Sequence, residues 1–406
     1  PFWLYSLGQP LHKESPSVGL PIATMARGRK LLVVGALALL VASWNPAFVP
    51  GPRAARSNPA VAASPAVPAL LAAAPAAFAD GIADAAKKFS DATYPIAEKF
   101  DWGGSSAIAK YIADASASNP RQAAQAVEKL LEVGLTMDPK LVRAAVEAHS
   151  KALDSAVTNP KLVASKEDFA AVNEALARMI ASADKQKFAA LRTAFPESRE
   201  LQSKLFAGNN AFEAEKAYDS FKALTSAVRD ASINGAKAPI VAEAARAERY
   251  VPDGPVGRAA KAFSEATYPI MEKLDWVKSP EISKYLATAS SKDPKMMAQG
   301  IDKTLEVALT MNQNLINDAV YAHLRAIKGA LNTPGFVADR DDFARVNLAL
   351  AKMIGSADPA KFKALLTAFP GNADLQMALF AANNPEQAKA AYETFVALTS
   401  AVAASV

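Results

Sequence analysis

Two histidines could do chemistry here, because a neutral imidazole can bind a metal ion or accept a hydrogen bond. His149 and His323 are the only histidines after residue 79. On a helix, the neighbours of His149 one turn away include Ala145 and Val146, so the imidazole lies on an apolar face beside small residues. His323 has matching neighbours. Each is either a core histidine bonded to the backbone, or a group that faces a planar ligand filling the flat space beside the alanines.

Other chemistry has little support in the sequence. The chain has no Cys, which excludes disulfides, thiolate nucleophiles and iron–sulfur clusters. We find no glycine-rich phosphate loop, metal-spaced His/carboxylate cluster or Ser/His/Asp arrangement. Asp101 and Asp275, each followed by Trp, fit helix ends and packing better than acid catalysis. Tyr94 and Tyr268 are either core residues or a cavity wall. The sequence therefore gives no support to an enzymatic function.

The positive charge is confined to the front of the chain. The 406 residues carry a formal charge of +5. Residues 1–79 hold six basic and one acidic residue, a net +5, and the remainder has 45 − 6 = 39 basic and 40 − 1 = 39 acidic residues. The part from residue 80 onward therefore has no net charge, and nucleic acid is not an expected partner.

The first 79 residues have the composition of a targeting leader. Met25 is the first plausible initiator, so residues 1–24 are expected to be untranslated. A basic cluster and a 12-residue apolar run at 31–42 indicate a signal peptide over 25–47. Residues 48–79 suit a transit segment with a second apolar stretch and cleavage after Ala79. The order is similar to leaders that reach a thylakoid lumen. A single signal peptide followed by a disordered Ala/Pro linker is the alternative.

The part after the leader is a duplication. At an offset of 174 residues, 79 of the 144 positions from 85 to 228 match their partner without a gap. The sequence therefore predicts one half at 80–228 and a second at 258–406, related by a pseudo-twofold axis. Asn-Gly and Pro-Asp-Gly-Pro signals mark 229–257 as a linker.

Each half is predicted to be all-α. Apolar residues recur at spacings of three and four, and no alternating β-branched run occurs. Capping residues before Pro120 and Pro139 mark two helix starts, and Pro95 and Pro269 should kink or end the first helix of each half. The expected helices, each repeated at +174, are 81–100, 105–116, 120–136, 139–156, 166–182, 185–194, 198–207 and 211–228.

Several short motifs, in order and in both halves, resemble the soluble peridinin–chlorophyll a proteins of dinoflagellates. The resemblance covers 80–402. The motifs are Asp91-Ala92-Thr93-Tyr94, Asp101-Trp102, Asp138-Pro139-Lys140-Leu141, Glu147-Ala148-His149, Val172-Asn173 with Ala175-Leu176, and Ala214-Glu215-Lys216-Ala217-Tyr218.

The resemblance implies a light-harvesting antenna. Two helical halves would form a cup around peridinins, chlorophyll a and lipid, and excitation would pass from carotenoid to chlorophyll and on to antenna or photosystem complexes of the thylakoid membrane. It implies that His149 and His323 hold the chlorophyll magnesium through water, and that Asn173 and Asn347 lie beside a peridinin. A homo-oligomer is possible. The alternative is a diverged structural or docking subunit of a photosystem that binds few pigments.

Overall fold

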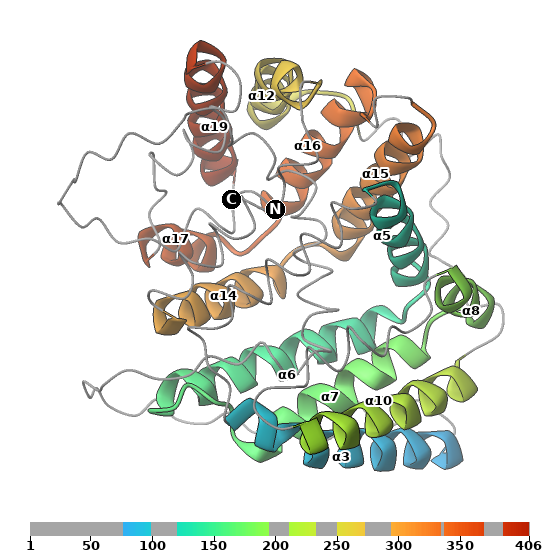
Figure 1. The fold of residues 1–406 in the computed structure, drawn as a ribbon. Helices are drawn as coiled ribbons and strands as arrows, with labels where there is room; N and C mark the ends of the chain where they lie inside the picture. The colour runs from blue at the N-terminus through green and yellow to red at the C-terminus, as the bar shows by residue number, and fades with distance from the viewer. Residues whose placement is uncertain are drawn as a thin grey trace. The chain divides into compact units, whose positions relative to one another are not determined.

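The computed structural model describes residues 76–98, 120–194, 211–232, 250–272, 294–333, 337–368 and 385–405. Within these ranges all regular structure is helical, which confirms the predicted all-α class (Figure 1). The first repeat contributes α3 (Ala76–Glu98), α5 (Pro120–Gly134), α6 (Pro139–Thr158), α7 (Lys166–Ala181), α8 (Lys185–Ala194) and α10 (Ala211–Ala231). The second contributes α12 (Gly254–Glu272), α14 (Pro294–Ala308), α15 (Gln313–Leu331), α16 (Arg340–Ile354), α17 (Pro359–Ala368) and α19 (Pro385–Ser405).

Helix starts follow the capping signals of the sequence. Asp138 accepts a hydrogen bond from the backbone N of Lys140, and Asn312 does the same for Asn314. Ser165 caps α7 through the backbone N of Asp168. Such caps satisfy N–H groups that the first helical turn leaves unpaired. The expected helices at 105–116 and 198–207, and their repeats, lie outside the described residues, as does the leader up to residue 75.

The two internal prolines do not end their helices. Pro95 lies inside α3 and Pro269 inside α12, and each helix continues for three residues, to Glu98 and Glu272. Proline removes a single i→i−4 hydrogen bond, and near a helix end few residues depend on that bond. The sequence left open whether each proline kinks or ends its helix. The prediction that the helix ends at the proline was wrong.

The helices form two compact units. The N unit contains α3, α6, α7, α8 and α10, and α3 packs on both α7 and α10. Its core includes Phe89, Leu176 and Leu224, which are fully buried, and the ring of Phe89 lies 6.1 Å from that of Phe221. The C unit contains α5 and all helices from α12 to α19. There α12 packs on α16 and α19, and Phe263 meets Phe395 at the same 6.1 Å. The duplicated sequence therefore gives duplicated packing.

The units depart from the sequence repeats at α5. This helix belongs to the first repeat, yet it packs on α15 of the second (Figure 1). Lys328 forms an ion pair of 2.7 Å with Glu132, and Arg121 donates to the carbonyl of Leu331. Burial acts to raise the pKa of Glu132, but hydrogen bonds from Lys328 and Lys129 outweigh it and the pKa falls. The repeat boundaries at 80–228 and 258–406 stay a prediction.

Gly257 is required by the segment that precedes α12. A Cβ at Gly257 would lie 2.5 Å from the carbonyl carbon of Pro252, which is too close for any side chain. The first repeat has Ala83 at this position, inside α3. We expect Gly257→Ala to lower the free energy of unfolding by roughly 1–3 kcal/mol, since backbone must shift. Thermal denaturation measures the loss.

Gly81→Ala is the matched control for this substitution. Gly81 lies in α3, and a Cβ there meets nothing within 4 Å. Alanine in an open helical position is favoured over glycine by about 1 kcal/mol, so this variant should be slightly more stable. Equal effects of the two substitutions would show that the contact with Pro252 has no energetic importance.

Candidate functional site

His149 is held by α6 in a fixed tautomer. Its Nδ1 lies 2.9 Å from the carbonyl oxygen of Ala145, one turn back on the same helix. A carbonyl only accepts hydrogen bonds, so Nδ1 carries the proton. Burial lowers the pKa of His149, which keeps the imidazole neutral at pH 7. The proton-free Nε2 is buried and has no hydrogen-bond partner among the described residues. A buried lone pair without a donor is what a ligand would complete.

His323 repeats this geometry on α15. Its Nδ1 lies 2.8 Å from the carbonyl oxygen of Ala319, and burial lowers its pKa to about 4. Both imidazoles therefore present Nε2 as an acceptor at neutral pH. Each imidazole side chain is half-buried.

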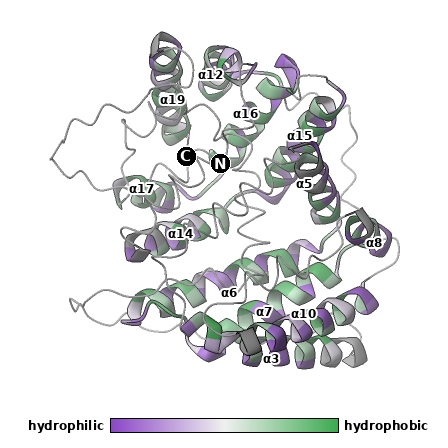
Figure 2. Ribbon diagram, viewed as in Figure 1, coloured by the Kyte–Doolittle hydropathy of each residue, from purple (hydrophilic) through white to green (hydrophobic). Residues whose placement is uncertain are grey.

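The packing of α6 around His149 also favours a ligand beside the imidazole. In α6 only Ala145 and Ala156 of 20 residues are buried, whereas ten of the 16 residues of α7 are. Figure 2 shows hydrophobic residues along α6. Many of them are only half-buried: Leu141, Val142, Val146, Ala148, Ala152, Leu153 and Val157. Apolar side chains that the protein covers only in part suit the wall of a site for an apolar ligand.

Asn173 and Asn347 are brought to equivalent places in the two units. Nδ2 of Asn173 donates to Oγ of Ser90 at 3.0 Å, and Ser90 donates to the carbonyl of Ala86. Asn347 bonds Ser264 at the same distance. Each asparagine therefore joins α7 to α3, or α16 to α12. An amide has two N–H donors and a carbonyl, so this bond leaves capacity for a ligand.

Tyr94 and Tyr268 make equivalent contacts within their own repeats. The hydroxyl of Tyr94 donates to the carbonyl of Ala164 at 3.0 Å, and that of Tyr268 to Ala338 at 3.1 Å. Their rings meet Phe169 and, in the second repeat, Phe343. Tyr268 is buried, which favours the core, whereas Tyr94 is half-buried, and the choice between core and cavity wall stays open there. Asp101, Asp275 and the tryptophans that follow them lie outside the described residues.

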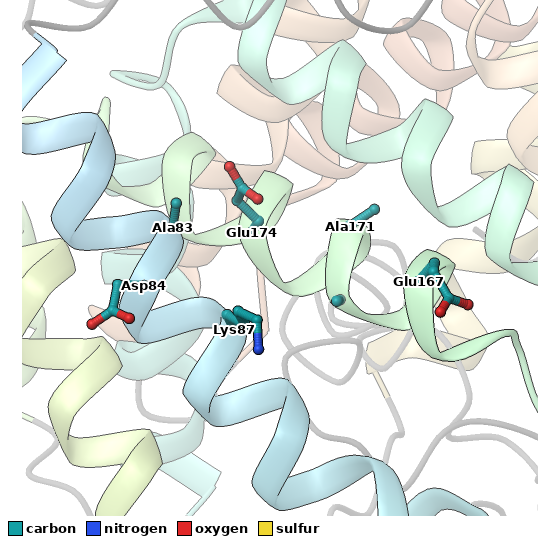
Figure 3. A pocket seen from close by; sticks show the side chains of 7 residues that line it. Ala83, Asp84, Lys87, Glu167, Ala171 and Glu174 are labelled. Carbon is teal, nitrogen blue, oxygen red and sulfur yellow. The ribbon is translucent and has the colours of Figure 1, made fainter.

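A groove of about 450 Å³ lies between α3 and α7 (Figure 3). Alanines form part of its wall, and the charged residues Asp84, Lys87, Glu167 and Glu174 also line it. It contains neither His149 nor Asn173, so it is not the candidate ligand site.

The carboxyl groups at the starts of α7 and α16 differ in charge environment. Burial acts to raise the pKa of Asp168, but hydrogen bonds from Ser165 and Lys151 outweigh it. In the second repeat burial and the neighbouring Asp339 raise the pKa of Asp342, despite its ion pair of 2.6 Å with Arg325. Burial is the larger cause of the raised pKa of Asp342, and the aspartate that replaces serine at the cap adds to it.

Asp339→Ser should lower the pKa of Asp342, because serine still caps the helix but carries no charge. A raised carboxyl pKa costs stability above that pKa, and the cost disappears as the pH falls through it. The variant should therefore gain stability at neutral pH, and the gain should vanish in acid. Carboxyl NMR titration measures the shift. Ser165→Asp is the reciprocal control and should raise the pKa of Asp168; unchanged pKa values in both variants would contradict the explanation.

The described residues lack two other kinds of feature. No group of three or more His, Cys, Asp or Glu among them is placed to hold a metal ion. No described helix has the length and hydropathy to cross a bilayer. What the described residues do contain is a duplicated, all-helical arrangement in which a neutral imidazole on α6 and another on α15 present Nε2 as a hydrogen-bond acceptor.

The chain belongs to the peridinin–chlorophyll a binding protein family. The model of that family, described as "Peridinin-chlorophyll A binding protein", matches residues 80–228 and 253–402. The chain is 94% identical over 323 residues to peridinin-chlorophyll a-binding protein 3 of Amphidinium carterae, covering 80% of this chain and all of that protein. It is 33% identical over 389 residues to a chloroplastic relative of Symbiodinium sp., covering 94% of this chain and 100% of the relative.

Solved structures give the same result. The chain is similar to a peridinin-chlorophyll a protein in its high-salt form, with a TM-score of 0.69 and 88% identity, over 80% of this chain and all of that one. The resemblance inferred from the sequence motifs is therefore confirmed.

Proposed function

We propose that this protein is a light-harvesting antenna that binds chlorophyll a and peridinin and passes excitation from the carotenoid to the chlorophyll. The 94% identity to a protein named for binding these pigments is the observation that carries the proposal. The names of the relatives describe pigment binding, so a docking subunit with few pigments is not favoured. No bond is made or broken in such a function, so this is not an enzyme.

His149 and His323 are proposed to hold one chlorophyll each. Chlorophyll would supply a magnesium ion, which binds oxygen or nitrogen ligands. The neutral imidazole with Nδ1–H bonded to Ala145 or Ala319 presents Nε2 as an acceptor, which suits a magnesium-bound water or the metal itself. The half-buried apolar residues of α6 exclude water and bind the ring and tail of a pigment by burying apolar surface.

Asn173 and Asn347 are proposed to donate a hydrogen bond to one peridinin in each repeat. The N–H that is not used by Ser90 or Ser264 is available for this. A donor fixed in place would shift the absorption of that carotenoid relative to the others.

The location proposed is the plastid, and more narrowly the thylakoid lumen. Relatives are named chloroplastic, and the family match begins at residue 80, next to the expected cleavage after Ala79. The acceptor of the energy would be a membrane antenna or photosystem complex, with lipid as a further ligand.

Pigment content tests the proposal. The full chain, refolded with chlorophyll a and peridinin and passed over a sizing column, should carry both pigments in its protein peak. A folded but colourless protein under these conditions would contradict the proposal and favour a structural subunit.

A further inference from the structure

Tyr250 lies outside the predicted bounds of both sequence repeats. It nevertheless packs on α15, the helix that carries His323. Its hydroxyl donates to the carbonyl oxygen of Asp318 at 2.8 Å. Its ring packs against the cluster of small buried residues that contains Ala319 and Ala322 of α15. A residue of the predicted linker is thus part of the C unit.

The contact reaches the turn that orients the imidazole. The carbonyl of Ala319 accepts the hydrogen bond from Nδ1 of His323 at 2.8 Å. Tyr250 therefore covers the residue whose carbonyl fixes the ring. Arg345 of α16 lies with its guanidinium 5.5 Å from the centre of the Tyr250 ring, a cation–π distance. The tyrosine is consequently held from α15 and α16 together.

The first repeat lacks this arrangement. At an offset of 174 residues the partner of Tyr250 is Ala76, and the partner of Arg345 is Ala171. Ala322 is 4% exposed, whereas its counterpart Ala148 is half-buried. The turn before His323 is therefore packed by a tyrosine at a position where the first repeat has an alanine.

We infer that Tyr250 is a positioning residue for the second chlorophyll site. By fixing the Asp318–Ala322 turn of α15, Tyr250 fixes the orientation of the His323 imidazole. As a consequence, the two chlorophyll sites differ in how strongly they retain the pigment and in its transition energy. The inference rests on the proposed function. The inference adds that Tyr250, a residue of the predicted linker, makes the two chlorophyll sites differ, although the sequence repeat predicts that they are equivalent.

The test uses the full chain refolded with chlorophyll a and peridinin, with one site removed at a time. In a His149→Leu background only the His323 site remains, and Tyr250→Ala should accelerate chlorophyll loss about tenfold, the effect of one hydrogen bond and its packing. It should also shift the chlorophyll red band at cryogenic temperature. In a His323→Leu background the same substitution should change the loss rate by less than about twofold, because Tyr250 packs on α15 and α16 and the remaining site is on α6.

Two further variants separate positioning from general stability. Tyr392 packs on the core of the same unit, and Tyr392→Ala should not discriminate between the two backgrounds. Tyr250→Phe removes only the hydroxyl and should give a smaller, still site-selective effect; it decides the matter if Tyr250→Ala does not fold. An equal effect of the Tyr250 variants in both backgrounds, or no effect in either, would overturn the inference. Failure of the proposed function would appear instead as a parent protein without chlorophyll.

Discussion

Replacing both His149 and His323 by leucine is expected to remove most of the chlorophyll from the protein while its helices remain folded. Leucine keeps the apolar character of the α6 and α15 faces but has no lone pair to replace Nε2. Losing a hydrogen bond or metal contact to a charged centre costs about 1.5–3 kcal/mol, or roughly 10- to 100-fold in retention per site. Chlorophyll content and the red absorption band, measured after refolding with pigments, give the result.

Each single substitution should lose about half of the chlorophyll, since each imidazole serves its own repeat. Thr158→Leu is a suitable control, because Thr158 is an exposed residue at the end of α6 and leucine there leaves His149 intact. Unchanged chlorophyll content and an unchanged red band in the double variant would show that the histidines are core residues and not ligands.

Removing the pigments should destabilise the protein strongly. Without ligands, the half-buried apolar residues of α6 around Val146 and Leu153 face water. Each Å² of apolar surface that a pigment covers contributes about 25 cal/mol. Ligands at 1,000 times their dissociation constant stabilise the native state by about 4 kcal/mol, which corresponds to roughly 5 °C in a chain of this size.

Differential scanning calorimetry of protein refolded with and without pigments measures this difference. Addition of chlorophyll a and peridinin to the pigment-free protein should restore the higher melting temperature, which controls for damage during extraction. Identical melting temperatures would mean that the protein is as stable without pigments as with them. The half-buried apolar face of α6 would then not be a ligand surface.

Much of the site could be predicted from local sequence. The helices follow from apolar spacing and from caps such as Ser165 and Asp138, since these signals act within one or two turns. His149 and His323 were identified because an internal repeat kept both while Glu147 and Tyr321, beside them, differ. The hydrogen bond to the carbonyl of Ala145 also follows from an i−4 spacing.

Other features depend on contacts that local sequence does not encode. Both repeats contain similar helices, so the pattern around Glu132 does not say that α5 packs on α15 instead of a helix of its own repeat. The bond from Asn173 to Ser90 spans 83 residues. Tyr250 was missed because it lies among turn residues of a predicted linker. An aromatic residue in such a segment was the available signal that the segment packs on a helix.

The fluorescence excitation spectrum of the pigment-bearing protein tests the central claim most directly. With emission observed from chlorophyll a, the account predicts a large excitation band at the wavelengths where peridinin absorbs, of a height close to that in the absorption spectrum. An excitation spectrum that contains only the chlorophyll bands, from a protein that carries both pigments, would contradict a light-harvesting function.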